Sequence, residues 1–257
     1  MTQRRSSPSN RAQPRASGRV RLDRALSKLG YASRREARAL IEQGRVRVDG
    51  RRRNDPAHLV VPETAGITID DQAPARTAWR TIALHKTRGT VTTRRDPEGR
   101  PTIFAALGRD GDGLIAVGRL DMASTGLILL TTDTRLASQL TDPARGVVRR
   151  YVVTARGAVT DDEAAQMERG IGDLRANRVT ILKRSRRETH LEIELTEGRN
   201  REIRRLLDGV GHEVTRLLRV AFGGIELGRL QPGEWREITR TEIERTLRQA
   251  AHGPMTR

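Results

Sequence analysis

The stretch that decides the fold is GRLDMASTGLILLTTD, residues 118–133. Its second half holds four consecutive apolar residues, 127–130, which predict a buried strand. Its first half places Arg119 and Asp121 two residues apart beside a glycine, and we expect them to form an ion pair at the entrance to that strand. A buried carboxylate is costly unless it is paired or takes part in chemistry. Residue spacing alone favours a loop-capping role for Asp121 over a catalytic one.

The chain is strongly basic. Its 257 residues include 49 Lys+Arg and 32 Asp+Glu, a formal net charge of +17, and only three of the basic residues are lysines. A GC-rich genome explains the choice of arginine over lysine, but it does not explain the excess of cations. Arginine presents a planar fork of donors that suits phosphate. The composition therefore predicts a polyanionic partner, and nucleic acid fits best.

Several protein classes lack support in the sequence. There is no cysteine, which excludes disulfides and thiolate metal sites. No HExxH, GxSxG or Walker motif is present, so zinc hydrolases, serine hydrolases and P-loop NTPases are not indicated. No apolar run approaches the ~20 residues of a membrane span, so we expect a soluble, cytoplasmic protein with no membrane association. The scarcity of aromatic residues disfavours a binder that stacks single-stranded bases.

The first seventy residues predict a tail and a small module. Residues 1–18 have no hydrophobic period and no acid, which predicts a disordered basic tail. Within 19–70, apolar spacing predicts one helix that ends at Gly30 and a second that begins with the Ser33/Glu36 capping box. Asp49-Gly50 then predicts a basic hairpin. Arginines that converge from these elements favour contact with RNA over a merely solvated face.

The rest of the chain predicts a linker, one large domain and a tail. Residues 71–80 contain Pro74 and read as the linker, 81–245 as the large domain and 246–257 as a flexible C-terminal tail. Strands are expected at 81–86, 113–118, 126–132, 149–155, 178–184, 189–196 and 214–221. Helices are expected at 133–142, 160–170 and 200–211. Many strands with a few peripheral helices predict an α+β fold on a mainly antiparallel sheet.

The small module resembles a known family. LDRALSKLGYASRREARALIEQGRVRVDG, residues 22–50, is similar to the S4-like RNA-binding domain, in which a helix pair and the following strand bind structured RNA. The resemblance implies an RNA-binding surface that comprises Arg34, Arg35, Arg38 and Arg47.

The large domain carries four further motifs, in order. HKTRGTVTTRRDPEGRPT, GRLDMASTGLILLTTD, RRYVV and EGRNREIRRLLDGVGHEVTRLLRVAFG resemble the motifs of ribosomal RNA pseudouridine synthases of the RsuA/RluB type, which commonly carry an S4-like domain in front. The resemblance runs from about residue 20 to about residue 240 and implies isomerisation of uridine to pseudouridine. An isomerisation needs no metal, cofactor or co-substrate, so none is expected.

The resemblance also implies roles for individual residues. Asp121 matches the catalytic aspartate of the family, and Tyr151 matches the tyrosine that packs on the target base and moves a proton. Arg204 matches the basic residue that pairs with the aspartate, and Arg119 matches an arginine implicated in displacing the base. Asp121 attacks the anomeric carbon, adds to the uracil ring or assists glycal formation, and the motifs leave these three routes open.

The match also has departures and flanking arginines. Thr87 stands where the family usually has proline, which predicts a looser turn at the end of that strand. Arg150 stands where lysine is common, and it preserves the charge. Arg199 and Arg201 flank the motif of Arg204 and are expected to contact RNA phosphates.

The expected partner is ribosomal RNA, bound by a monomer. The final motif is closer to the RluB branch than to the RsuA branch, which favours a uridine in 23S rRNA over one in 16S rRNA. A non-enzymatic ribosome-assembly factor would use the same basic surfaces without needing Asp121, Tyr151 and Arg204 together. A nucleoside hydrolase or glycosidase would need a second placed carboxylate or a metal, whereas Glu197 and Asp133 read as turn and cap residues.

Overall fold

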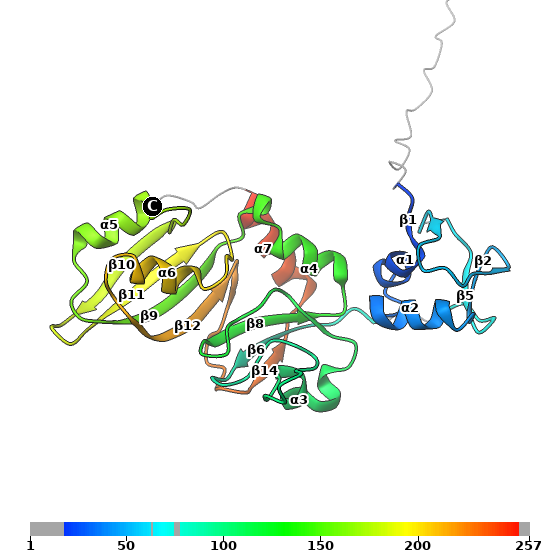
Figure 1. Cartoon of the computed structure of the whole chain (residues 1–257), viewed down its shortest axis with the longest axis horizontal. Helices are drawn as coiled ribbons and strands as arrows, with labels where there is room; N and C mark the ends of the chain where they lie inside the picture. The colour runs from blue at the N-terminus through cyan, green and yellow to red at the C-terminus, as the bar shows by residue number, and fades with distance from the viewer. Residues whose placement is uncertain (1–17, 63, 75–77, 252–257) are drawn as a thin grey trace, which may run out of the picture. The chain divides into compact units, whose positions relative to one another are not determined.

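The computed structural model describes residues 18–62, 64–74 and 78–251, which form parts of two compact units, Met1–Arg76 and Thr77–Arg257 (Figure 1). Residues 1–17 of the expected basic tail and residues 252–257 lie outside the described part. The predicted fold class, a small α/β unit followed by an α+β unit with a mainly antiparallel sheet, is confirmed.

The smaller unit consists of a helix pair and short strands around its own core. Its elements are β1 (Val20–Arg21), α1 (Leu22–Lys28), α2 (Arg34–Glu42), β2 (Val46–Val48), β3 (Arg51–Arg52), β4 (Leu59–Val60) and β5 (Ile67–Ile69). The predicted capping box at α2 is present, with the Ser33 N–H donating to Glu36 at 2.9 Å and the Glu36 N–H donating to Ser33 at 3.3 Å. Asp49 and Gly50 both have positive φ and join β2 to β3 as predicted.

The larger unit is built on one mixed sheet. Its strands are β6 (Thr81–Lys86), β7 (Ile115–Ala116), β8 (Thr125–Thr131), β9 (Arg149–Arg156), β10 (Arg178–Arg184), β11 (Glu188–Leu195), β12 (Val214–Phe222), β13 (Ile225–Glu226) and β14 (Trp235–Glu237). The order β10-β11-β9-β12-β8-β6-β14 is antiparallel except between β12 and β8, which run parallel. All four leucine and isoleucine residues at 127–130 are fully buried, as the opening motif predicts.

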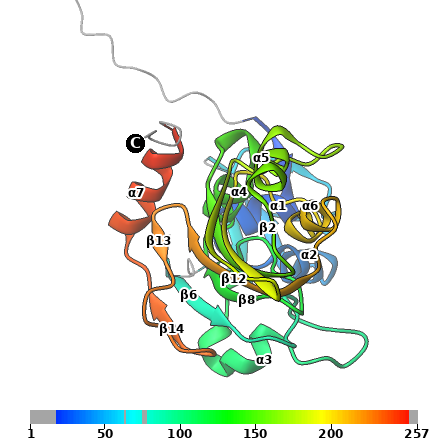
Figure 2. The same cartoon turned by 90° about the vertical axis from the view of Figure 1, so that its left-hand side faces the viewer.

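Helices cover both faces of this sheet. They are α3 (Ile103–Leu107), α4 (Thr134–Thr141), α5 (Asp161–Arg169), α6 (Glu202–Asp208) and α7 (Arg240–Ala251), with short 3-10 turns at Gly108–Gly111 and Pro143–Arg145. One core cluster contains Met167 of α5 and Leu206 of α6, and another contains Leu136 of α4 and Ile243 of α7. Figure 2 shows α6 and α7 on opposite sides of the sheet.

The C-terminal part differs from the sequence-based expectation. Helix α7 continues to Ala251, through residues expected to belong to a flexible tail. Thr239 and Glu242 form a capping box at its start, with N–H···O distances of 2.9 and 3.2 Å, and Thr246 is fully buried. Helix α6 begins at Glu202 rather than at residue 200, because Arg201 adopts a left-handed backbone conformation.

Candidate active site

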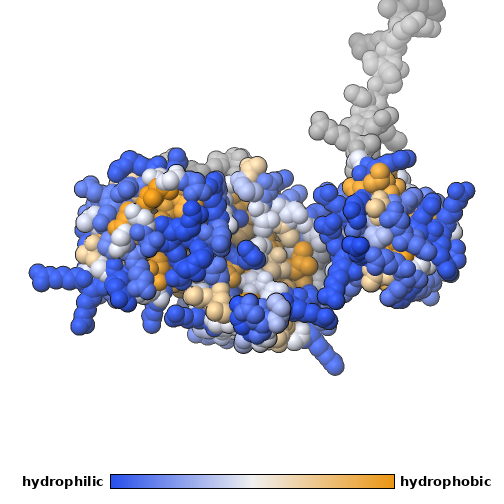
Figure 3. Space-filling model, in the orientation of Figure 1, coloured by the Kyte–Doolittle hydropathy of each residue, from blue (hydrophilic) through white to orange (hydrophobic). Residues whose placement is uncertain are grey.

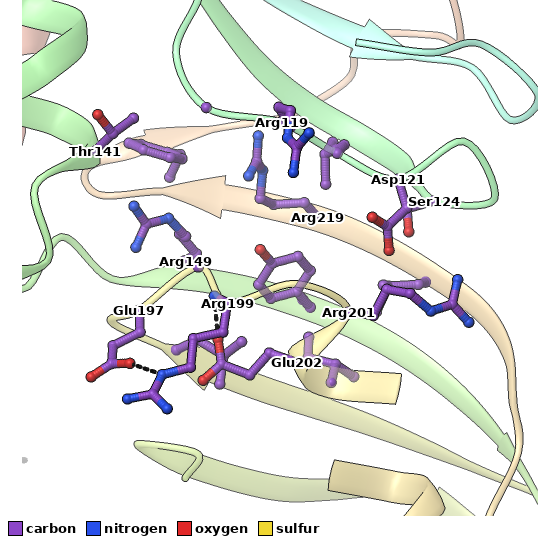
Figure 4. A pocket seen from close by; sticks show the side chains of 18 of the residues that line it. Arg119, Asp121, Ser124, Thr141, Arg149, Glu197, Arg199, Arg201, Glu202 and Arg219 are labelled. Carbon is purple, nitrogen blue, oxygen red and sulfur yellow. Dashed lines mark hydrogen bonds and ion pairs between the residues drawn. The ribbon is translucent and has the colours of Figure 1, made fainter. Parts of the chain in front are cut away.

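A cavity of about 540 Å³ lies in the larger unit, between the loop before β8, strands β9 and β12, and the start of α6 (Figure 4). It is lined by every residue of the larger unit for which the sequence predicts a catalytic or RNA-binding role: Arg119, Asp121, Tyr151, Arg199, Arg201 and Arg204. Six arginines and three carboxylates line it altogether, so the cavity is cationic. This charge suits an anionic ligand.

Asp121 presents a half-buried carboxylate to the cavity. Its carbonyl accepts from the Ser124 N–H at 3.0 Å, a turn that bends the chain directly after Asp121. Within the described residues its carboxylate has no hydrogen bond or ion pair, so the expected pair with Arg119 is not formed. The side chain of Arg119 is exposed, and Figure 4 places it apart from Asp121. The carboxylate is therefore free to act on a ligand.

Lys86, which the sequence reasoning did not select, holds the loop that carries Asp121. It ends β6, is 1 % exposed, and its Nζ donates to the carbonyls of Thr87 at 3.0 Å and Ser124 at 2.8 Å. Burial lowers the pKa of Lys86 to about 8, against the opposing effect of the Asp121 charge. The sequence did contain a signal for this residue, because Lys86 is a lone lysine at the end of an apolar strand. Thr87, in place of the family's usual proline, also accepts from Thr90 Oγ1 at 2.9 Å.

Tyr151 forms part of the cavity wall and of the core. It lies on β9, is 7 % exposed, and stands opposite Arg219 of β12 in the strand register. Alternation along the strand places Arg149 on the same buried side. Arg150 does not line the cavity and pairs with Glu226 at 2.9 Å.

Arg204 lies near Asp121 without touching it. It is half-buried on α6, and its Nη1 donates to the Val214 carbonyl at 2.9 Å. Burial lowers the pKa of Arg204, as does the charge of Arg201, whereas the charge of Asp121 raises it. The expected ion pair with Asp121 is not formed among the described residues, because the Val214 carbonyl holds the guanidinium. Arg204 therefore acts on Asp121 through space.

The cavity contains carboxylates that the sequence reasoning did not place there. Glu202 is 4 % exposed and accepts from the Arg199 N–H at 3.1 Å, and burial raises its pKa. Glu197 also lines the cavity, where it pairs with Arg199 at 2.5 Å, and Arg199 pairs with Asp173 at 2.8 Å. Asp133 caps α4 as expected, accepting from two backbone N–H groups at 2.9 and 3.1 Å. Glu197 and Glu202 thus both have partners within the protein, whereas the carboxylate of Asp121 has none among the described residues.

The smaller unit carries the arginines expected to bind RNA. Arg34 and Arg35 lie exposed at the start of α2. Arg38 pairs with Glu42 at 2.7 Å, and Arg47 pairs with Asp71 at 2.5 Å. Exposed pairs of this kind contribute little to stability, so a phosphate can compete for both arginines.

Neither a metal-binding cluster nor a membrane-spanning helix is present among the described residues. No group of three or more His, Asp or Glu side chains in residues 18–62, 64–74 and 78–251 is arranged to hold a metal ion. None of the helices placed in those ranges has the length and apolar character needed to span a membrane.

Comparison with known proteins assigns the chain to a family. The RNA pseudouridylate synthase model matches residues 80–208, and the S4 domain model matches residues 20–64. The chain belongs to the RNA pseudouridylate synthase family and is a pseudouridine synthase with an S4 domain, which confirms the resemblance drawn from the motifs.

Individual relatives agree with this assignment. Ribosomal large subunit pseudouridine synthase B of Escherichia coli K12 is 39 % identical over 229 residues, covering 85 % of this chain and 79 % of the relative. The protein of the same name from Yersinia pestis is 38 % identical over 229 residues, covering 85 % and 72 %. A crystal structure of a pseudouridylate synthase matches with a TM-score of 0.62 and 26 % identity, covering 88 % of this chain and 99 % of that one.

Proposed function

We propose that this chain converts a uridine of 23S rRNA into pseudouridine, with Asp121 as the reactive carboxylate. The observation that carries the proposal is the free, half-buried carboxylate of Asp121 in a cavity that also contains a buried tyrosine and an excess of arginines. The large-subunit target is supported by the names of the relatives that share 38–39 % of its sequence.

The chemistry requires only groups that the chain supplies. The C1′–N1 bond of uridine breaks, C1′ joins C5 of the same uracil, C5 loses its proton and N1 gains one. Asp121 acts on the sugar or on the ring during the detachment, and Tyr151 supports the base and moves a proton. Lys86 and Arg204 place positive charge near this carboxylate. The uridine must first leave its stack to enter the cavity.

RNA binding is divided between the two units in this proposal. Arg119, Arg199 and Arg201 contact the RNA at the cavity, and Arg34, Arg35, Arg38 and Arg47 of the smaller unit contact phosphates elsewhere on it. Hydrophilic residues dominate the face of each unit drawn in Figure 3, and the chain has 49 Lys+Arg against 32 Asp+Glu, which suits a polyanionic partner. In this proposal the protein acts as a monomer, because residues of a single chain are enough to line the cavity.

The test is to incubate the purified protein with 16S and 23S transcripts separately and to map pseudouridine in each. We expect one modified uridine, in the 23S transcript. Modification confined to 16S would contradict the target assignment. Tight binding to 23S without modification would support a ribosome-assembly factor instead.

A further inference from the structure

Two arginines of the cavity are buried without an anionic partner. Arg149 of β9 is 6 % exposed and Arg219 of β12 is 2 % exposed. Arg149 donates only to carbonyls, those of Thr196 at 2.6 Å, Val147 at 3.2 Å and Leu140 at 3.4 Å. Neither arginine forms an ion pair with a carboxylate of the described residues. Two cations without a directly bound carboxylate thus lie in the wall of the cavity, and Glu202 acts on Arg149 only through space.

Arg219 also has an unused donor. Its Nε donates to the Leu127 carbonyl at 2.6 Å, but its Nη2 is buried and has no hydrogen-bond partner among the described residues. An unsatisfied buried donor costs free energy, and more when the group is charged. An unpaired buried donor of this kind is expected at a binding site, where a ligand accepts the missing hydrogen bond.

The two guanidinium groups lie over the same aromatic ring. Their Cζ atoms are 5.0 and 5.2 Å from the centre of the same ring, that of Phe222. Burial lowers the pKa of Arg149, and the charge of Arg219 lowers it further, whereas Tyr151 and the charge of Glu202 oppose this shift. Two like charges in a poorly solvated wall repel each other, and an anion between them removes that repulsion.

The fold holds Arg219 in this position through the opening motif. A Cβ atom on Gly126 of β8 would lie 2.3 Å from the Arg219 carbonyl oxygen, so only glycine permits β12 to approach β8 this closely. The approach brings the Arg219 guanidinium to the Leu127 carbonyl. Its placement is therefore built into the parallel pairing of the two strands.

We propose that Arg149 and Arg219 form a phosphate subsite that binds a phosphodiester group of the target nucleotide. This inference rests on the proposed function and extends it, because it fixes which end of the cavity takes the backbone. Figure 4 shows Arg149 and Asp121 at opposite ends of the cavity, so the phosphate lies at one end and the reacting base at the other. Guanidinium forks suit phosphate oxygens, and 540 Å³ lies within the range of about 300–1,000 Å³ for small-molecule sites.

The direct test compares uridine 5′-monophosphate with uridine as ligands of the full-length protein, by phosphorus and proton NMR titration. In Arg219→Met, affinity for the monophosphate should fall about ten- to a hundredfold, while affinity for uridine stays unchanged. Arg219→Lys should recover part of the loss. Arg216→Met is the matched control, since Arg216 is an exposed arginine on the same strand and lies outside the cavity. Equal monophosphate affinities in wild type and Arg219→Met would overturn the proposal.

A second pair of variants keeps both buried arginines. Thr141 is a half-buried cavity residue, next in sequence to Leu140, whose carbonyl accepts from Arg149. Thr141→Glu should place a competing carboxylate at the subsite and weaken the monophosphate about tenfold or more relative to the neutral Thr141→Gln. If Arg219→Met does not fold, the two Thr141 variants test the subsite instead. Equal affinities of Thr141→Glu and Thr141→Gln for the monophosphate would then contradict the proposal.

The two proposals fail separately. Monophosphate binding that depends on Arg219, in a protein that modifies neither rRNA, would retain the subsite and refute the proposed target. Modification of 23S rRNA by a wild-type protein that binds the monophosphate no better than uridine would refute the subsite alone.

Discussion

Gly126→Ala is the substitution whose effect on the free energy of unfolding is best defined by the structure. The added Cβ would lie 2.3 Å from the carbonyl oxygen and 2.6 Å from the nitrogen of Arg219, where ordinary contact begins at 3.4 Å. Because both neighbours are backbone atoms, β8 and β12 must separate by about 1 Å, an overpacking that costs about 1–3 kcal/mol. Gly126 also has φ +107°, and holding alanine there costs about 1–3 kcal/mol more. We expect a loss of about 2–6 kcal/mol in the free energy of unfolding.

The matched control is Gly146→Ala. Gly146 has φ 58° and ψ 31° and no atom within 4 Å of an added Cβ, so only the left-handed backbone is penalised, by about 1–2 kcal/mol. Urea unfolding, followed by tryptophan fluorescence and circular dichroism, measures both variants. Gly126→Ala should also lower turnover, because β12 carries Arg219 into the cavity. If Gly126→Ala is no less stable than Gly146→Ala, the close approach of the two strands is not as described.

Three further predictions concern a buried cation, the tyrosine and the smaller unit. The folded-state pKa of Lys86, about 8, lies below the usual 10.5, so its burial destabilises the fold fully below pH 8 and stability recovers towards pH 10.5. We therefore expect the free energy of unfolding of wild type, relative to that of Lys86→Met, to rise by about 3 kcal/mol between pH 8 and pH 10.5. A constant difference between the two proteins across this pH range would contradict the prediction. Tyr151→Phe keeps the buried ring and removes the hydroxyl, so turnover should fall about a hundredfold or more at unchanged RNA affinity; unchanged turnover would exclude proton transfer by that hydroxyl. Deletion of residues 1–74 should leave a folded larger unit, which has its own core, with weaker and less salt-dependent rRNA binding, and an unchanged salt slope would show that the smaller unit makes no phosphate contacts.

Local signals in the sequence predicted local structure. The capping boxes at Ser33 and Thr160 are both present, because each depends only on residues three positions apart. The similar Thr239/Glu242 signal was overlooked, so no helix was expected here and the second half of α7, from residue 246 on, was assigned to a tail. The parallel pairing of β12 with β8 could not be predicted, because it depends on strands about ninety residues apart in the sequence.

The site was predictable to the extent that the motifs carry it. Asp121, Tyr151 and Arg204 line one cavity, as the resemblance implies. The expected ion pairs of Asp121 with Arg119 and Arg204 are not formed among the described residues, and spacing could not reveal this because backbone carbonyls and turns set the side-chain directions. Arg219 did leave a signal that was not used. It is a charged residue in the apolar run LLRVAF, and burial of such a cation points to a function.

The central claim is that the carboxylate of Asp121 reacts with the target uridine, and Asp121→Asn tests it most directly. Within the described residues this carboxylate makes no hydrogen bond or ion pair, so the nearly isosteric amide should leave the fold and RNA affinity unchanged. The measurement is single-turnover pseudouridine formation on the 23S transcript, with binding of the same transcript followed in parallel. We expect binding at the wild-type level and a rate lower by about a thousandfold or more. A variant that binds normally and retains more than about one-hundredth of the wild-type rate would show that Asp121 is not the reacting group.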